Sequence, residues 1–145
     1  ADCIPADFIA AAVGARPAPW LAASGLAVDD RGFVRVDATL RSITDPRVFA
    51  VGDVAHLDHA PRPKAGVFAV RQGPVLERAL VAAATGVAPP VYTPQTDYLR
   101  LVSLGRRRAV AVKHGLAVGG LGPVGAALWR LKDRIDRGFM AGLEN

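Results

Sequence analysis

The chain has 145 residues, of which 51% are hydrophobic, and its formal net charge is +5. No apolar run reaches the ~18 residues that span a bilayer, and the single cysteine, Cys3, excludes an internal disulfide. The positive charge does not predict a nucleic-acid partner, because the one dense basic run, residues 106–108, has no interleaved aromatic platform.

The first predicted elements lie between residues 6 and 37. Residues 6–17, ADFIAAAVGARP, form an apolar run that predicts a strand ending near Gly14. A short helix or turn is predicted at residues 20–25. Residues 30–32, Asp-Arg-Gly, predict a hairpin turn that leads into a strand over residues 33–37.

A strand and a Gly-Asp turn come next. Residues 48–51 form a short apolar run rich in β-favouring residues, which is typical of a strand covered on both faces. Gly52 lets the backbone adopt an unusual φ. Asp53 presents a carboxylate just past the carboxyl end of the strand, where open α/β sheets bind their ligands. A Val-Gly-Asp triplet has little specificity alone, and an ordinary buried strand with an exposed Asp explains it too.

A long helix is predicted after the loop that follows Asp53. It is expected to begin near residues 64–67 and to end at Thr85, with Gly86 as its stop. Pro74 lies inside this segment, where it is expected to kink the helix or to start a second one.

Residues 45–78, DPRVFAVGDVAHLDHAPRPKAGVFAVRQGPVLER, resemble the second flavin-contacting motif of the FAD-dependent pyridine nucleotide-disulfide oxidoreductase superfamily. The resemblance implies that Gly52 and Asp53 bind FAD, with the Asp on a ribityl hydroxyl. It also implies that the N-terminus of the next helix points at the pyrimidine edge of the flavin, through Lys64, Ala65, Gly66 and Val67. The partial positive charge of that end would stabilise a reduced flavin by ~0.3–1 kcal/mol, or ~2 kcal/mol if partly buried.

Two earlier segments resemble the same superfamily. Residues 6–17 match its A-T-G-x-R-P strand end, with Val13 where a Thr is usual. The backbone role of Gly14 can survive that change, whereas a hydroxyl contact cannot. Residues 25–37 match the stretch G-L-x-x-D-x-x-G-x-x-x-V-D that leads to the Gly-Asp motif.

Two side chains near the helix start have open interpretations. Lys64 is expected either to stabilise an anionic reduced flavin or a quinone oxygen, or to be an ordinary solvated lysine. Gln72 resembles the Gln of the A-x-Q helix in NADH:quinone and sulfide:quinone oxidoreductases, which implies a position on the acceptor side; a polar helix face is the alternative. His56 and His59 have no further ligand cluster, so no metal site is predicted.

No segment is predicted to form the glycine-rich fingerprints, G-x-G-x-x-G directly after a strand, that bind the FAD pyrophosphate and NAD(P)H in the superfamily. The segment Gly119-Gly120-Leu121-Gly122 follows no clear strand–helix pattern and is predicted to be a flexible loop. The chain is therefore expected to be the C-terminal portion of a longer oxidoreductase, and its partner would be the missing N-terminal FAD/NAD-binding portion.

The second half of the chain changes in character. Residues 88–94 contain three prolines and predict a stiff connector. Residues 98–104, 109–113 and 116–118 predict an antiparallel β-meander. Residues 124–139 predict an amphipathic helix, in which apolar side chains recur at steps of three and four on one face: Leu128, Leu131, Ile135 and Phe139.

The sequence WRLKDRIDRGFM, residues 129–140, resembles the ending of a bacterial subgroup of type II NADH dehydrogenase-like proteins, some of them fused to selenide, water dikinase. This implies FAD as cofactor, NAD(P)H as substrate and a quinone-like acceptor in a cytoplasmic protein, with peripheral contact at the inner membrane surface as an option. A basic face with Trp129 at its edge suits a lipid surface. Packing within the chain or in a homo-oligomer is preferred, because Asp133 and Asp136 dilute that face.

The predicted fold class is α/β (α+β). Residues 1–88 are expected to form a partial FAD-binding Rossmann-like domain, and residues 89–145 a small antiparallel meander with a C-terminal helix. Two functions remain at this point. The first is a fragment of a flavin-dependent NAD(P)H oxidoreductase that is inactive alone; the second is a non-catalytic module for dimerisation or partner docking.

Overall fold

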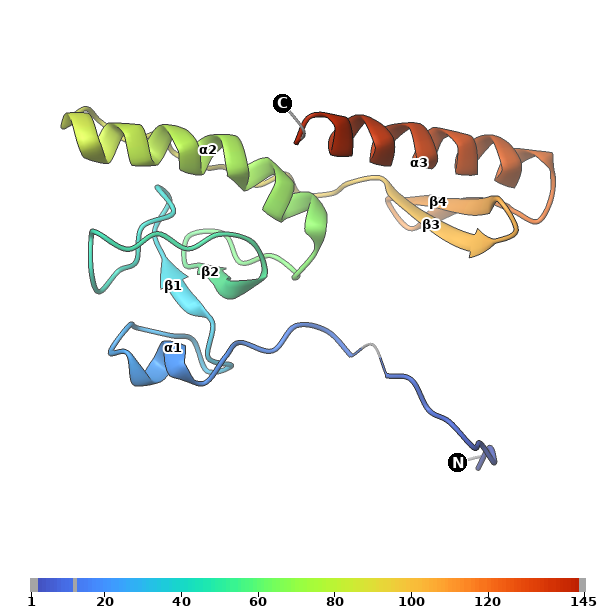
Figure 1. Cartoon of the computed structure of the whole chain (residues 1–145), viewed down its shortest axis with the longest axis horizontal. Coiled ribbons are helices and arrows are strands. Elements are labelled where there is room, and N and C mark those ends of the chain that lie inside the picture. Colours follow the sequence, from blue (N-terminus) through green and yellow to red (C-terminus); the bar gives the residue numbers. More distant parts are fainter. Residues whose placement is uncertain (1–2, 12, 144–145) are drawn as a thin grey trace. The chain divides into compact units, whose positions relative to one another are not determined.

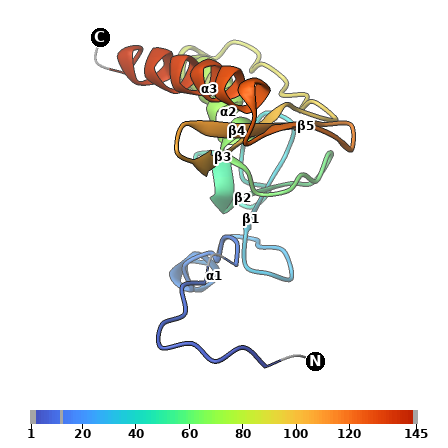
Figure 2. The ribbon, with the colours of Figure 1, turned by 90° about the vertical axis from the view of Figure 1, so that its right-hand side faces the viewer.

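The computed structural model describes residues 3–11 and 13–143 (Figure 1). The chain divides into two compact units, Ala1–Pro94 and Gln95–Asn145. Helices and strands occur in both, as the two perpendicular views show (Figure 2). The predicted α/β class is confirmed, and so are the antiparallel three-stranded sheet and the C-terminal helix.

The first unit is built around two short parallel strands. Val34 of one strand lies opposite Ala55 of the other, and Val36 lies opposite Leu57. The elements of this unit, in chain order, are α1 (Trp20–Ala23), β1 (Val34–Val36), the 3-10 helix η1 (Gly52–Val54), β2 (Ala55–Leu57) and α2 (Gly66–Thr85). The short helix or turn that was predicted at residues 20–25 is confirmed as helix α1 over residues 20–23 and a turn at residues 24–25.

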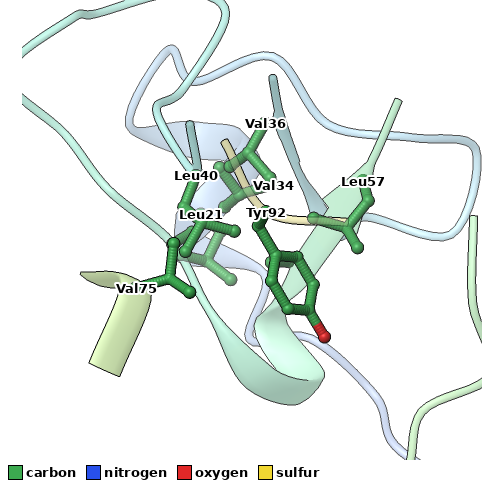
Figure 3. Close-up of a cluster of buried hydrophobic side chains, with 9 residues drawn as sticks. Leu21, Val34, Val36, Leu40, Leu57, Val75 and Tyr92 are labelled. Carbon is green, nitrogen blue, oxygen red and sulfur yellow. The ribbon is translucent and has the colours of Figure 1, made fainter. Parts of the chain in front are cut away.

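The core of the first unit follows from the period of two in β1. Val34 and Val36 point inward, while Arg35 between them points outward and forms an ion pair of 2.7 Å with Asp58. The last part of the unit joins the same core, because the Tyr92 N–H donates to the Ala38 carbonyl at 2.8 Å. Figure 3 shows the cluster, which consists of Leu21, Val34, Val36, Leu40, Ala50, Ala55, Leu57, Val75 and Tyr92.

The predicted hairpin turn before β1 is confirmed. The Gly32 N–H donates to the Asp29 carbonyl at 3.0 Å, and the Asp29 N–H donates to the Phe33 carbonyl at 2.9 Å. An antiparallel bridge between Val28 and Val34 closes the hairpin.

The strand predicted over residues 48–51 is wrong in extent and in burial. Only Phe49 forms a bridge, to Arg41, and within residues 48–51 only Ala50 is fully buried. The segment that pairs with Phe49 begins at Arg41, directly after Leu40. Leu40 has a left-handed φ of 66°, which bends the chain there and limits the pairing between the two segments. The parallel strand instead forms at β2, after the Gly-Asp turn.

The strand predicted over residues 6–17 is also wrong: residues 6–11 and 13–17 form no strand. Phe8, Ile9 and Val13 are 84%, 81% and 92% exposed. A strand exists only through hydrogen bonds to a neighbour, and none of the described residues pairs with this segment. The apolar pattern alone therefore did not determine its structure.

Helix α2 begins and ends where the sequence predicts. Ala65 precedes it in an extended conformation, and Gly86 ends it with a left-handed φ of 75° and an N–H bond to the Ala82 carbonyl at 2.9 Å. Pro74 lies inside the helix, which nevertheless runs continuously over its 20 residues. The buried side chains recur every three or four positions and face the core: Phe68, Gln72, Val75, Ala79 and Ala82.

The second unit is a three-stranded antiparallel meander with one helix. Its elements are β3 (Arg100–Gly105), β4 (Arg108–Lys113), β5 (Leu116–Gly120) and α3 (Pro123–Ala141). The turn between β3 and β4 uses left-handed residues, with φ of 48° at Arg106 and 55° at Arg107, as a two-residue hairpin of type I′ requires. The predicted meander is thereby confirmed.

Helix α3 confirms the amphipathic helix that was predicted over residues 124–139. Its acidic residues pair along the helix, Asp133 with Arg137 at 2.8 Å and Asp136 with Lys132. The apolar side chains of Leu131, Ile135 and Phe139 stay about half exposed. Neither α3 nor any other helix among the described residues combines the length and apolar character that a bilayer span requires.

The predicted flexible loop at residues 119–122 is wrong for Gly119 and Gly120, which belong to β5, and the segment does connect a strand to a helix, because α3 begins at Pro123. A Cβ on Gly119 would lie 2.5 Å from the Ala109 carbonyl oxygen, and a Cβ on Gly125 of α3 would lie 1.6 Å from the Gly120 oxygen. These glycines therefore let α3 pack directly on the sheet backbone. Their sequence pattern resembled a loop, whereas their role is close packing.

Candidate functional site

The turn at Gly52 and Asp53 has a backbone that only glycine adopts easily. Gly52 has a φ of 67°, and a Cβ at this position would lie 3.3 Å from the Cβ of Ala69 on α2. Asp53 follows within η1, and its side chain is exposed. The turn thus lies close against α2 and presents a carboxylate to solvent.

The side chain of Gln72, on α2, forms a hydrogen bond with the backbone of this turn. Its side chain is 3% exposed, and its Oε1 accepts a hydrogen bond from the Gly52 N–H. A buried amide is costly unless it is hydrogen-bonded, so this contact satisfies both groups at once. The sequence placed Gln72 within the first turns of the helix, but it did not indicate this contact.

The N-terminus of α2 meets the same turn. Gly52, Asp53, Lys64 and Ala65 line a common hollow of about 20 Å³, enough for about one water molecule. Ala65 has no side chain that could cap the helix, and no side-chain cap is present at this end. The first N–H groups of an α-helix have no acceptor within the helix. The exposed carboxylate of Asp53 and the uncapped N-terminus of α2 therefore lie at the same hollow.

Lys64 is fixed against the protein rather than extended into solvent. Its Nζ donates to the Ala55 carbonyl and lies 3.9 Å from the centroid of the Phe33 ring. Burial lowers the pKa of the Lys64 ammonium, and the charges of Asp29 and Asp53 offset part of that effect. Lys64 is thus a half-buried positive charge that contacts Ala55, two residues after Asp53.

Asp29 and His56 form a second polar group at the edge of this hollow. Asp29 accepts the Phe33 N–H at 2.8 Å and the Arg31 N–H at 3.0 Å, and its Oδ2 lies 3.1 Å from His56 Nδ1. Burial raises the pKa of the Asp29 carboxyl, but the two N–H bonds and the charges of His56 and Lys64 outweigh it, so the pKa lies below 3.8.

The lowered pKa of Asp29 predicts a contribution to acid sensitivity. Because the folded pKa is depressed, the stabilisation by Asp29 is complete above 3.8 and is lost as the pH falls through the folded pKa. We expect the free energy of unfolding of the native chain to fall more steeply between about pH 5 and about pH 3 than that of Asp29→Asn. Urea unfolding at both pH values tests this, and parallel slopes would contradict it.

A larger cavity is also lined by Asp53. Its volume is about 790 Å³, within the range of small-molecule sites, and its lining is mainly apolar. Arg16, Trp20, Leu21 and Phe49 contribute to the lining, and Asp53 and Asp45 supply carboxylates. Asp53 therefore lines both the large cavity and the small hollow.

The structure brings together most of the residues that the sequence singled out. The sequence analysis missed Asp29, Phe33 and Ala69, although the short spacing between Asp29 and Phe33 is a signal of a side-chain-capped turn. His59 lies apart from this group and contacts the Tyr92 carbonyl at 3.0 Å. Within residues 3–11 and 13–143, no three His, Cys, Asp or Glu side chains gather as metal ligands would. The predicted site residues that share the hollow are Gly52, Asp53, Lys64, Ala65 and Gln72.

A family model of the pyridine nucleotide-disulphide oxidoreductases matches residues 1–86, which include the turn and all of α2. The match covers more than half of the chain, and the chain therefore belongs to the pyridine nucleotide-disulphide oxidoreductase family. A search among curated proteins found no significant match.

Proposed function

We propose that this chain supplies one wall of the FAD site in an NAD(P)H oxidoreductase that passes electrons to a quinone-like acceptor. The observation that carries the proposal is the convergence of Asp53 and the uncapped start of α2 on one hollow. Membership of the family supports the use of a flavin and a pyridine nucleotide.

The hydrogen-bonding groups of these residues match those of a flavin, although the hollow itself holds only about one water molecule. Gly52 leaves no Cβ where the backbone passes close to α2, and Asp53 offers an exposed carboxylate that can accept hydrogen bonds from hydroxyl groups. The α2 N-terminus offers N–H donors and partial positive charge to an electron-rich ring edge. A polyhydroxylated chain attached to such a ring satisfies both sets of groups.

In the proposed site, FAD and the residues of this chain have different roles. FAD, when bound, would supply the hydride and electron transfer chemistry, and the residues of this chain would bind and orient it. Asp53 would hold a ribityl hydroxyl, and Gly66 and Val67 would face the pyrimidine edge. Lys64 would act as a fixed positive charge behind the turn, because its ammonium already contacts Ala55 and Phe33.

The finer parts of the proposal have separate support. The quinone-like acceptor and the type II NADH dehydrogenase-like subgroup are supported by the resemblance of residues 129–140. The one G-x-G-x-x-G string of the sequence, residues 120–125, joins the antiparallel strand β5 to α3 and does not lie in a parallel βαβ unit. This supports the proposal that the chain is not catalytic by itself.

An FAD titration of the purified chain, followed by flavin fluorescence, tests the proposed site. We expect Asp53→Ala to weaken FAD binding by about tenfold or more, because a hydrogen bond to a charged group contributes about 1.5–3 kcal/mol. Asp30→Ala is the matched control, since Asp30 is an equally charged exposed residue of the hairpin turn. Equal FAD affinity in the two variants, or no binding by the native chain, would contradict the proposal.

A further inference from the structure

Gln72 is the one fully buried polar side chain on the inner face of α2. Its neighbours on that face are Phe68 and Val75, both apolar, and Gln72 itself is only 3% exposed. An apolar residue would satisfy the core packing at this position without any desolvation cost. The amphipathic pattern of α2 therefore does not explain why an amide side chain occupies position 72.

The contacts of Gln72 supply that reason. Its Oε1 accepts the N–H of Gly52, the residue that directly precedes Asp53. Ala69, one helical turn before Gln72, packs against the same glycine. One face of α2 thus fixes Gly52 by a hydrogen bond and by close packing, and the same helix carries the N-terminus that shares the hollow with Asp53.

We propose that Gln72 is a positioning residue that sets the FAD-binding conformation of the Gly52–Asp53 turn. This inference rests on the function proposed above. The Oε1 of Gln72 is occupied by the backbone of the turn, so the side chain acts through Asp53 instead of contacting the electron acceptor. Gly52 contacts Gln72 and Ala69 of α2, and the free N–H donors belong to the start of the same helix. The distance between the Asp53 carboxylate and these donors is therefore fixed.

Two measurements on the full chain test the inference. The first is hydrogen exchange at the Gly52 amide, which reports the bond without any ligand. We expect Gln72→Leu to accelerate this exchange by about tenfold or more, whereas Gln72→Glu, measured at a pH low enough to keep its buried carboxyl protonated, retains an acceptor oxygen and keeps the protection. The second is FAD affinity, which we expect to fall by about tenfold in Gln72→Leu and to be largely kept in Gln72→Glu at that pH.

Val75→Ala is the control for a purely structural effect. Val75 lies on the same buried face and in the core cluster, so its truncation destabilises the unit without removing the hydrogen bond to Gly52. We expect Val75→Ala to lose stability while it retains FAD affinity. A loss of FAD affinity in both variants, in proportion to their loss of stability, would overturn the positioning role.

The outcomes separate this inference from the proposed function. If the native chain binds no FAD, the proposed function fails, and exchange at Gly52 still decides whether Gln72 orders the turn. If the chain binds FAD and Gln72→Leu binds it equally well, the positioning role fails and the proposed function stands. Unchanged exchange at Gly52 in Gln72→Leu would also overturn the positioning role.

Discussion

Replacing Gly125 by Ala is expected to unfold the second unit, although the same change stabilises most helices by roughly 0.5–1 kcal/mol. Gly125 lies in the first turn of α3, and an added Cβ would lie 1.6 Å from the Gly120 oxygen and 2.7 Å from the Gly120 carbon. Both neighbours are backbone atoms of β5, which cannot move aside as a flexible side chain does. Overpacking of this kind costs about 1–3 kcal/mol and occasionally more, a large share of the stability of so small a unit.

Gly138→Ala provides the matched control in the same helix. Nothing lies within 4 Å of an added Cβ at Gly138, so this change is expected to stabilise α3. Urea unfolding followed by Trp129 fluorescence, with Trp20 replaced by Phe, reports the second unit alone. If Gly125→Ala proves as stable as Gly138→Ala, the close packing of α3 on β5 is wrong.

Replacing Gly52 by Ala is expected to have the largest effect on the proposed site. The φ of 67° costs an L-residue about 1–2 kcal/mol, and the new Cβ would press on Ala69 at 3.3 Å. The turn would relieve both problems by moving away from α2, and Asp53 would move with it. We expect FAD affinity to fall by about tenfold or more, as for the removal of Asp53 itself.

Gly86→Ala separates backbone strain from the site. Gly86 has a similar φ of 75° but open space around an added Cβ, and it lies at the far end of α2. Both variants are expected to lose stability in thermal unfolding, and only Gly52→Ala is expected to lose FAD affinity. Equal FAD affinities in the two variants would show that the turn does not position a ligand.

The sequence predicts elements best where local chemistry determines them. The end of α2 at Gly86 and the turn at residues 30–32 depend on glycine conformations, and the predicted positions agree with the structure. The α3 helix follows from the apolar repeat of steps of three and four between Leu128 and Phe139. Strands were harder, because a strand also needs a partner. Residues 6–17 have a strand-like pattern, but the described residues among them, 6–11 and 13–17, have no partner strand, whereas β2 has a partner in β1 and little pattern.

The candidate site shows the same limit. Motif spacing identified Gly52, Asp53 and the start of α2, because these roles depend on the backbone. It could not identify the Gln72 contact with Gly52, which joins residues 20 positions apart. Motif spacing also could not show that Lys64 contacts the Phe33 ring, since this contact depends on how the segment before β1 and the loop before α2 fold together.

The most direct test of the proposed FAD wall is a map of backbone amide chemical shifts of the chain during addition of FAD. The account predicts that the largest changes occur at Gly52, Asp53, Gly66 and Val67, with smaller changes at Lys64. Changes confined to the second unit, or no changes at the turn and at the start of α2 when FAD is bound, would contradict it.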